Sequence, residues 1–235
     1  MPVLLAVLSD IHANYQALRT AVDLAEQRGA EQLVSLGDVV GYGPDPSACL
    51  DLVRAEFVAN ILGNHDAAVA TGDGLDVLPP DGQAAATVHQ TLLSDDQRDW
   101  LASLPLVRTA YDATFVHAAP LHPERWPRLS SFGHVRSKFD AFETPLCFVG
   151  HSHKPAVVSD TIGVLRVRRG HRFLVDVGSV GQPRDRDPRL SFALFDTDAF
   201  RVEIVRAHYD HARTTVRVRE LGLPAALGDR LRRGV

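Results

Sequence analysis

Five short segments of the sequence place Asp, Asn or His directly after an apolar run. They occupy residues 9–12, 37–41, 63–66, 116–118 and 150–153. The runs before them, residues 3–8, 33–36, 57–62, 113–116 and 146–149, are short and rich in Val, Leu, Ile and Phe, which predicts buried strands. Loops at strand ends are where a rigid scaffold presents chemistry. We therefore expect the five segments to meet in one cleft if the strands lie side by side.

The side chains in these segments are metal ligands by type. They are Asp10, His12, Asp38, Asn64, His117, His151 and His153. Carboxylate, amide and imidazole ligands suit borderline divalent metals such as Mn, Fe, Ni, Co and Zn, and the absence of thiolate argues against a structural zinc site. Seven ligands exceed what one ion needs once water coordinates it. We expect two ions that share one carboxylate, roughly 3.5–4 Å apart, with a bridging water placed for in-line attack on phosphorus.

Each of these residues also has an ordinary structural explanation. Asp and Asn are common in the turns just after strands, and His117 could be a simple strand-end histidine because its segment is short. His151 and His153 lie two residues apart, so an extended segment would aim both to one side. The other histidines match no ligand position and are predicted on helices or at the surface, with His122 a weak exception: His89, His122, His134, His171, His208 and His211.

In chain order the motifs read D-x-H, G-D-x-x-G, G-N-H-D, a lone His and G-H-x-H. This order resembles the calcineurin-like metallophosphoesterases, and within them the small bacterial phosphodiesterase and diadenosine-tetraphosphatase-like members. Residues 9–14, 40–44 and 178–185 add to the similarity, which runs almost end to end. The resemblance implies a single α/β domain over residues 1–235, a four-layer αββα sandwich of two mixed β-sheets flanked by helices.

The resemblance also implies roles for the ligands. One metal would be held by Asp10, His12, Asp38 and His153, and the second by Asp38, Asn64, His117 and His151, with Asp38 as the bridge. His65 would be catalytic with Asp38, and would protonate the leaving oxygen or bind a phosphate oxygen. The expected cofactors are two divalent ions, with Mn favoured over Fe, Ni, Co or Zn. The expected activity is a two-metal phosphohydrolase that uses a metal-bridging water.

The second motif departs from part of the family. In the Ser/Thr phosphatases and the symmetric diadenosine-tetraphosphate hydrolases it reads G-D-x-V-D-R-G, where the extra Asp supports the catalytic His and the Arg binds phosphate. Gly41 and Tyr42 stand at those positions here. Without a bidentate guanidinium, recognition of a phosphomonoester is weakened. We therefore predict a phosphodiester or nucleotide-type substrate.

Three residues are candidate substrate contacts: Asn14, Tyr42 and Arg184. Each has an alternative. Asn14 can cap the helix that follows it, Tyr42 can be a packed loop aromatic, and Arg184 can pair with Asp185 or with Asp187 at the surface. Two other functions stay open: a protein or small-molecule phosphomonoesterase of the Ser/Thr phosphatase type, and a non-catalytic scaffold like the retromer subunit that resembles these enzymes.

Composition sets the broad class. The chain has 235 residues, 45% hydrophobic and 23% charged, with a net charge of −4, which is ordinary for a globular protein and gives no clear nucleic-acid or membrane surface. Neither a secretion signal nor a long apolar span is recognised. The two cysteines, Cys49 and Cys147, are expected as free thiols in a reducing compartment. We expect a cytoplasmic enzyme with a small-molecule phosphoester or nucleotide substrate, and a homo-oligomer is compatible with the sequence.

The remaining chain carries no ligand signal. Residues 67–105 predict helices, one of which opens with a capping box at Ser94; they form either a cap inserted over the cleft or helices packed outside the sandwich. A Pro-rich loop covers residues 118–133, and a helix is predicted over residues 133–142. Short strands then suggest an antiparallel meander, over residues 156–159, 162–167, 171–177, 191–196 and 200–207. Two helical segments, residues 209–221 and 225–232, close the chain.

Overall fold

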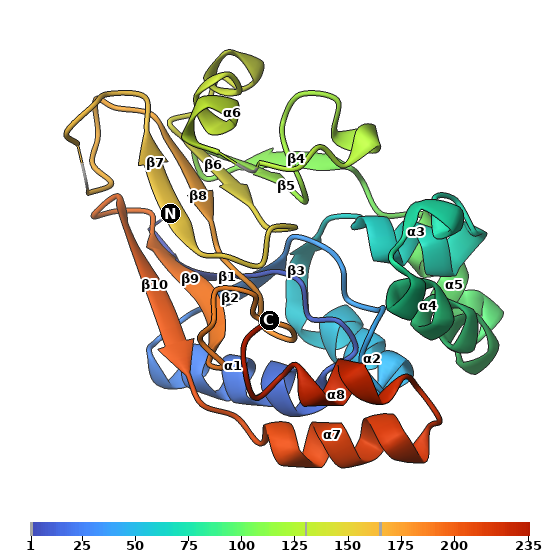
Figure 1. Cartoon of the computed structure of the whole chain (residues 1–235). Helices are drawn as coiled ribbons and strands as arrows, with labels where there is room; N and C mark the ends of the chain where they lie inside the picture. Colours follow the sequence, from blue (N-terminus) through green and yellow to red (C-terminus); the bar gives the residue numbers. More distant parts are fainter. Residues whose placement is uncertain (1, 130, 165) are drawn as a thin grey trace.

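The computed structural model describes residues 2–129, 131–164 and 166–235. These residues form two five-stranded sheets that pack face to face (Figure 1). The first sheet has the order β10-β9-β1-β2-β3, with the bounds β1 Leu4–Leu8, β2 Gln32–Ser35, β3 Phe57–Asn60, β9 Leu190–Asp196 and β10 Arg201–Ala207. The second has the order β4-β5-β6-β8-β7, with the bounds β4 Val107–Ala110, β5 Ala113–Val116, β6 Leu146–Val149, β7 Ala156–Ser159 and β8 Phe173–Asp176.

Parallel strands lie at the centre of both sheets. In the first sheet β1, β2 and β3 run parallel, and β9 and β10 add antiparallel on the other side of β1. In the second sheet β5, β6 and β8 run parallel between the antiparallel edge strands β4 and β7. Neighbouring parallel strands end at the same edge of a sheet, so the loops after β1, β2 and β3 must meet, as must those after β5 and β6.

The apolar run of β1 is buried on both faces. In β1, Leu5 and Val7 belong to the core between the two sheets, whereas Ala6 and Leu8 belong to the core between the first sheet and its helices. This alternation follows from the two-residue period of a strand, and an all-apolar strand is what burial on both faces requires. The rings of Phe115 and Phe148 stack in the core between the sheets, with centroids 5.4 Å apart.

Helices cover the sandwich on its outer sides (Figure 1). α1 (Tyr15–Gln27) and α2 (Pro46–Glu56) pack on the first sheet, α7 (His211–Glu220) packs against α1, and α8 (Ala225–Asp229) packs against α7. A second group lies beside β3: α3 (Asn64–Thr71), the 3₁₀ turn Leu75–Val77, α4 (Pro80–Leu92) and α5 (Asp95–Ala102). The outer face of the second sheet carries α6 (Phe132–Arg136) and the 3₁₀ turn Phe139–Ala141, and a further 3₁₀ turn, Pro123–Arg125, lies in the preceding loop.

The α/β sandwich predicted from the sequence is confirmed. Strands at residues 113–116, 146–149 and 156–159 have the predicted bounds, and Ser94 forms the predicted capping box at the start of α5. In residues 2–129, 131–164 and 166–235, no helix combines the length and apolar character that crossing a bilayer requires.

Three expectations for the later chain are wrong. Residues 162–164 and 166–167 form turns and bends instead of a strand, since Ile162 is 83% exposed and Gly163 has a φ of +85°; residue 165 lies outside the described residues. The predicted meander is split, because β7 and β8 join the second sheet whereas β9 and β10 join the first. The predicted helix over residues 133–142 breaks after Arg136 and resumes only as a 3₁₀ turn.

Candidate metal centre

The predicted ligands lie in the loops that leave the carboxyl ends of the central strands. Asp10 and His12 follow β1, Asp38 follows β2, Asn64 begins α3 after β3, His117 follows β5, and His151 and His153 follow β6. Main-chain hydrogen bonds join these loops to one another. The N–H of Asp10 donates to Gly37 O (3.0 Å), that of His12 to Asp38 O (2.8 Å), and that of Gly150 to His117 O (2.8 Å). The five segments therefore converge, and they come from both sheets.

Five of the seven predicted ligands have left-handed backbone conformations. The φ angles are +53° at Asp10, +49° at His12, +53° at Asp38, +63° at His151 and +61° at His153. Positive φ is uncommon outside glycine and costs about 1–3 kcal/mol per residue unless the surroundings hold it. The loops thus hold unfavourable backbone conformations that place these side chains.

One close approach explains a glycine of the third motif. A Cβ on Gly63 would lie 2.2 Å from both the backbone nitrogen and Oδ1 of Asp38. Only glycine allows the loop after β3 to pass this close to the loop after β2. As a result, the backbone N–H of His65 donates to Asp38 Oδ1 (2.8 Å), which fixes the carboxylate that lies between the two groups described next.

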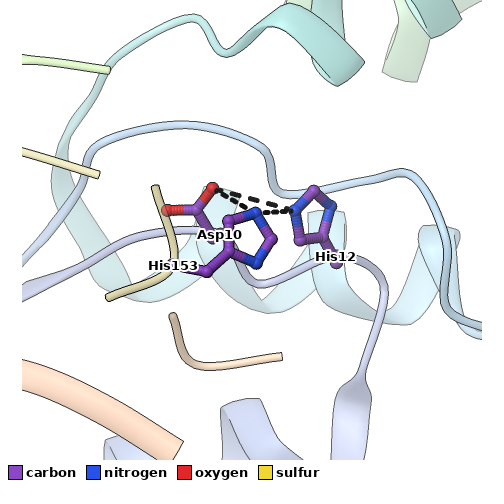
Figure 2. A group of neighbouring side chains, drawn as sticks. All are labelled: Asp10, His12 and His153. Atoms are coloured by element: carbon purple, nitrogen blue, oxygen red, sulfur yellow. Dashed lines mark hydrogen bonds and ion pairs between the residues drawn. The ribbon is translucent and has the colours of Figure 1, made fainter. Parts of the chain in front are cut away.

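Asp10, His12 and His153 form the first ligand group (Figure 2). Asp10 Oδ1 lies 3.2 Å from His153 Nε2 and 3.7 Å from His12 Nε2, and the two Nε2 atoms are 3.2 Å apart. The Nδ1–H of His12 donates to Val40 O (3.1 Å), and that of His153 donates to Gln182 O (2.5 Å). Because burial lowers the pKa of both rings, each Nε2 keeps a lone pair that faces the shared space.

Asp38, His117 and His151 form the second group. His117 Nε2 lies 3.3 Å from Asp38 Oδ2 and 3.2 Å from Asn64 Oδ1, while its Nδ1–H donates to Leu36 O (3.0 Å). The ring of His151 stands edge-on to that of His117, with centroids 5.1 Å apart. Asp38 Oδ2 also lies 3.7 Å from His12 Nε2. The carboxylate of Asp38 is therefore placed between the two groups, as a bridging ligand must be.

Buried charge dominates the electrostatics of the site. Burial lowers the pKa of His151 to about 3 and that of His65 to about 4. Burial also acts against a proton on His117, but the charge and hydrogen bond of Asp38, together with the charges of Asp10 and Asp66, outweigh it and raise the pKa of His117 to about 9. Burial disfavours ionisation of Asp10 and Asp38, yet their histidine neighbours hold both pKa values below the usual range. Two carboxylates thus stay ionised in the interior, which requires compensating positive charge.

These residues fit divalent cations. Asp10 Oδ1 is buried without a hydrogen-bond donor, and three imidazoles present Nε2 because a backbone carbonyl accepts from each Nδ1–H. Orienting a ligand through its other ring nitrogen is the usual support of a metal-binding histidine. A third group of possible ligands, His12, Asp38 and His65, joins the other two. Oxygen and nitrogen ligands in two groups with the Asp38 carboxylate between them are the set that a pair of ions needs.

A cavity of about 170 Å³ opens over the ligands. Its lining includes Asp38, Asn64, His65, His151, His153, Tyr42, Arg125, Trp126, Arg128, Arg184 and parts of residues 74–79. Tyr42 packs its ring on His65 (centroids 4.4 Å apart), and the Arg184 guanidinium lies 5.4 Å from the centre of the Tyr42 ring. The predicted alternative for Arg184, a surface ion pair, is not formed: its Nη2 donates to Gln182 Oε1 (2.8 Å), and Asp185 pairs with Arg206 instead.

Asn14 lies apart from this cavity. It is buried and caps α1, where its Oδ1 accepts from the N–H of Ala17 (3.2 Å) and from the hydroxyl of Thr214 (2.9 Å). Its Nδ2 donates to Gly181 O and to the hydroxyl of Tyr209. Both ends of the amide are therefore occupied by the protein itself. The exposed His122, the weak exception in the sequence, pairs only with Glu124 (3.5 Å) and also lies away from the ligands.

Two buried residues that support the site were not predicted. His89 in α4 accepts from the N–H of Gly41 at Nδ1 (3.1 Å) and donates from Nε2 to Gly43 O (2.8 Å), and burial lowers its pKa to about 4. Asp66 accepts from Val40 N–H (3.1 Å) and Gly63 N–H (3.2 Å). Together they hold the loop of the second motif. Asp66 could have been identified because it belongs to the G-N-H-D motif, whereas no sequence pattern marks His89. For Trp126 and Arg128, which line the cavity, the one indication in the sequence was their Pro-rich loop.

Comparisons with known proteins agree with this geometry. Residues 3–199 match the family model of the calcineurin-like phosphoesterase superfamily domain. The chain is 36% identical over 239 residues to the uncharacterized protein MJ0912 of Methanocaldococcus jannaschii. The aligned region covers 97% of each chain. It is 38% identical over 98 residues, 38% of this chain and 34% of the relative, to a symmetrical bis(5'-nucleosyl)-tetraphosphatase of a Janthinobacterium species.

The solved structures give the same result. A metallophosphoesterase from Sphaerobacter thermophilus is 36% identical, superposes with a TM-score of 0.88, and both chains are covered completely. Its two-sheet architecture is the one described above. The matched residues include all of the ligand loops of both sheets. The protein belongs to the calcineurin-like phosphoesterase superfamily, a family of phosphoric ester hydrolases.

Proposed function

We propose that this protein is a two-metal-dependent phosphohydrolase that acts on a phosphodiester or nucleotide-type substrate. The observation that supports it best is the pair of ligand groups with the Asp38 carboxylate between them, beside one cavity that has arginines in its wall. One ion would be held by Asp10, His12, His153 and Asp38. The other would be held by Asp38, Asn64, His117 and His151. When bound, such ions act as Lewis acids on the phosphoryl group and activate water as the nucleophile.

The chain itself supplies binding and proton transfer. His65 lines the cavity, while its Nδ1 is buried beside Gly41. Its side chain would therefore bind a phosphate oxygen or protonate the leaving oxygen. Arg184 lies against the Tyr42 ring on the same wall, where it would bind a non-reacting phosphate oxygen. Asp38, fixed by the His65 N–H, keeps the two ligand groups in register.

The second motif favours a diester over a monoester. Gly41 has a φ of +90°, and a Cβ at this position would lie 2.5 Å from Nδ1 of His65. The aspartate that the phosphatase motif carries here has no room beside His65 in this arrangement. The relatives include symmetrical bis(5'-nucleosyl)-tetraphosphatases, whose names give them a nucleotide substrate. We infer the same broad substrate class for this chain.

Two further assignments belong to this proposal. The segment that connects α3 to α4, residues 74–79, contributes to the lining of the cavity. We therefore assign residues 67–105 as a helical cap that forms one wall of the site. We place the enzyme in the cytoplasm because Cys49 and Cys147 are buried free thiols, the state expected of a reducing compartment. Manganese is the metal to test first, since the carboxylate and amide oxygens of Asp10, Asp38 and Asn64 suit it.

Hydrolysis by chelator-stripped protein tests the proposal. Each divalent metal is returned singly, and an aryl phosphomonoester, an aryl methyl phosphodiester and diadenosine tetraphosphate are compared. We expect metal-dependent cleavage that prefers the diester or the dinucleotide. Asp38→Asn should lower kcat/KM by more than about 100-fold, since even residues that only support a ligand typically cost 10–100-fold.

Two outcomes would redirect the assignment. A preference for the monoester would favour a phosphomonoesterase of the Ser/Thr phosphatase type. A protein that binds two ions per chain by elemental analysis, yet cleaves none of the three substrates with any metal, would be a scaffold. In both cases Asp38→Asn separates loss of metal from loss of chemistry, because its metal content is measured alongside its rate.

A further inference from the structure

A second and larger cavity adjoins the metal centre. It measures about 560 Å³ and lies between the outer face of the second sheet and the segment that carries α6. Its apolar lining comes from Leu129, Val135, Val158 and Leu174. Arg128, His151 and Arg184 line both this cavity and the one over the ligands. The two spaces are therefore neighbours that share a border, with one ligand and two arginines at that border.

Unpaired positive charge surrounds the second cavity. Arg128, Lys154, Arg184 and Arg186 line it, and within residues 2–129, 131–164 and 166–235 none of them forms an ion pair. Elsewhere in this net-negative chain many arginines are paired, as Arg206 is with Asp185 (2.6 Å). Four uncompensated cations around one opening favour an anionic ligand.

Asp176, the acidic side chain that lines the second cavity, does not neutralise these cations. Asp176 is buried at the end of β8, where burial raises its pKa well above the usual range. Its Oδ2 accepts from the Ser152 hydroxyl (2.6 Å) and its Oδ1 from the N–H of Gly178 (2.9 Å). Asp176 thus stabilises the turn after β8 through these hydrogen bonds, and the four cations remain available to a ligand.

The ligand must combine two kinds of chemistry. Cations at the border with the metal centre suit phosphate oxygens, whereas the floor of Leu129, Val158 and Leu174 suits a flat or apolar group. The volume lies within the range of about 300–1,000 Å³ that is typical of small-molecule sites. A phosphate chain that starts at the metal centre and ends in a base and sugar satisfies both.

We propose that the second cavity is a subsite for the distal nucleoside of a nucleoside polyphosphate, whose reacting phosphate lies at the metal centre. The intermediate phosphates pass Arg184 and Arg128, which border both spaces. This assignment rests on the proposed hydrolase function and narrows its substrate to one with a long polyphosphate arm. A small diester would reach the metal centre without entering the second cavity.

Two tryptophan variants test this subsite through turnover. Ala156 begins β7, is exposed and lines the cavity, so Ala156→Trp fills it. Val157 points to the opposite face of the same strand and does not line it, so Val157→Trp is the matched control. We expect Ala156→Trp to raise KM for diadenosine tetraphosphate at least tenfold and to leave kcat/KM for an aryl methyl phosphodiester unchanged. Equal effects on both substrates, or none, would overturn the proposal.

Equilibrium binding separates this subsite from catalysis. Calorimetry on metal-free protein in chelator compares adenosine triphosphate with inorganic triphosphate. We expect adenosine triphosphate to bind more tightly, and to lose at least fivefold in affinity with Ala156→Trp and with Arg186→Glu. Arg213→Glu, in the first turn of α7 and outside the cavity, should change nothing. Such binding without turnover of any phosphoester would refute the hydrolase function alone, whereas unchanged binding in both cavity variants would refute the subsite.

Discussion

At the scale of single residues, the metal centre is prepared by backbone carbonyls. Leu36 O, Val40 O and Gln182 O each accept from the Nδ1–H of one imidazole, so His117, His12 and His153 present Nε2 before any cation arrives. Pre-oriented ligands lose little rotamer freedom when they coordinate, which raises metal affinity. The same carbonyls belong to the loops that leave the strands. Ligand orientation is therefore a property of the fold.

Gly41→Ala should impair catalysis without removing the ligands. The new Cβ would meet His65 at 2.5 Å, so the imidazole must move from its place in the cavity wall. We expect kcat to fall at least about tenfold, a loss typical of a displaced acid–base group, with metal content per chain unchanged by elemental analysis. Gly72→Ala is the matched control, because Gly72 has a similar φ of +84° but nothing within 4 Å of its Cβ position. Equal loss in both variants would show that backbone strain alone is responsible.

His89 predicts a pH dependence of stability. Its folded pKa of about 4 lies below the ordinary value of 6.5, so between these pH values the unfolded chain binds more protons than the folded one. The unfolding free energy must therefore fall as pH drops through this window. In metal-free protein, His89→Gln should reduce the difference between pH 7 and pH 5 by about 2 kcal/mol. Urea titrations measure it, with His122→Gln on an exposed loop as control; an unchanged difference would contradict the assignment.

At the scale of elements, the sequence predicts strand ends better than strand partners. Short apolar runs followed by Asp or His mark the loops after β1, β2, β5 and β6, because burial and turn chemistry are local properties. The partner of a strand is not local: β8 joins β6 in one sheet and β9 joins β1 in the other, although both strands are apolar and follow turns. His89 and the second cavity were not predicted for the same reason, since each depends on segments distant in the chain.

Asn14→Ala tests whether this residue serves elements or substrate. Its amide caps α1 and also bonds Thr214 of α7 and Gly181 of the loop before β9. We expect a loss of roughly 2–4 kcal/mol in the free energy of unfolding, more than the ~1 kcal/mol typical of a cap alone. Ser94→Ala, which removes the cap of α5, is the comparison. A raised KM with unchanged urea stability would instead identify Asn14 as a substrate contact.

At the scale of the whole molecule, the metal centre joins the two sheets. Asp10, His12 and Asp38 come from the first sheet, and His117, His151 and His153 from the second. Ions held between them bind the folded chain and not the unfolded one. At 100 times its dissociation constant, each bound manganese ion should add about 2.7 kcal/mol, which for one ion is roughly 5–10 °C in Tm for a domain of this size. Scanning calorimetry with and without chelator measures this; no shift would mean that the sheets hold their ligands without bound metal.

The central position of β1 also determines when the first sheet can form during translation. β1 leaves the ribosome well before its antiparallel neighbour β9, which begins only at Leu190. At roughly 5–20 residues per second, translation leaves one edge of β1 without its native partner for about 10–40 seconds. During that interval the predicted metal ligands are synthesised in two groups, first those within residues 10–64 and then those within residues 117–153. Metal loading is therefore expected to follow the synthesis of β9, which closes the first sheet.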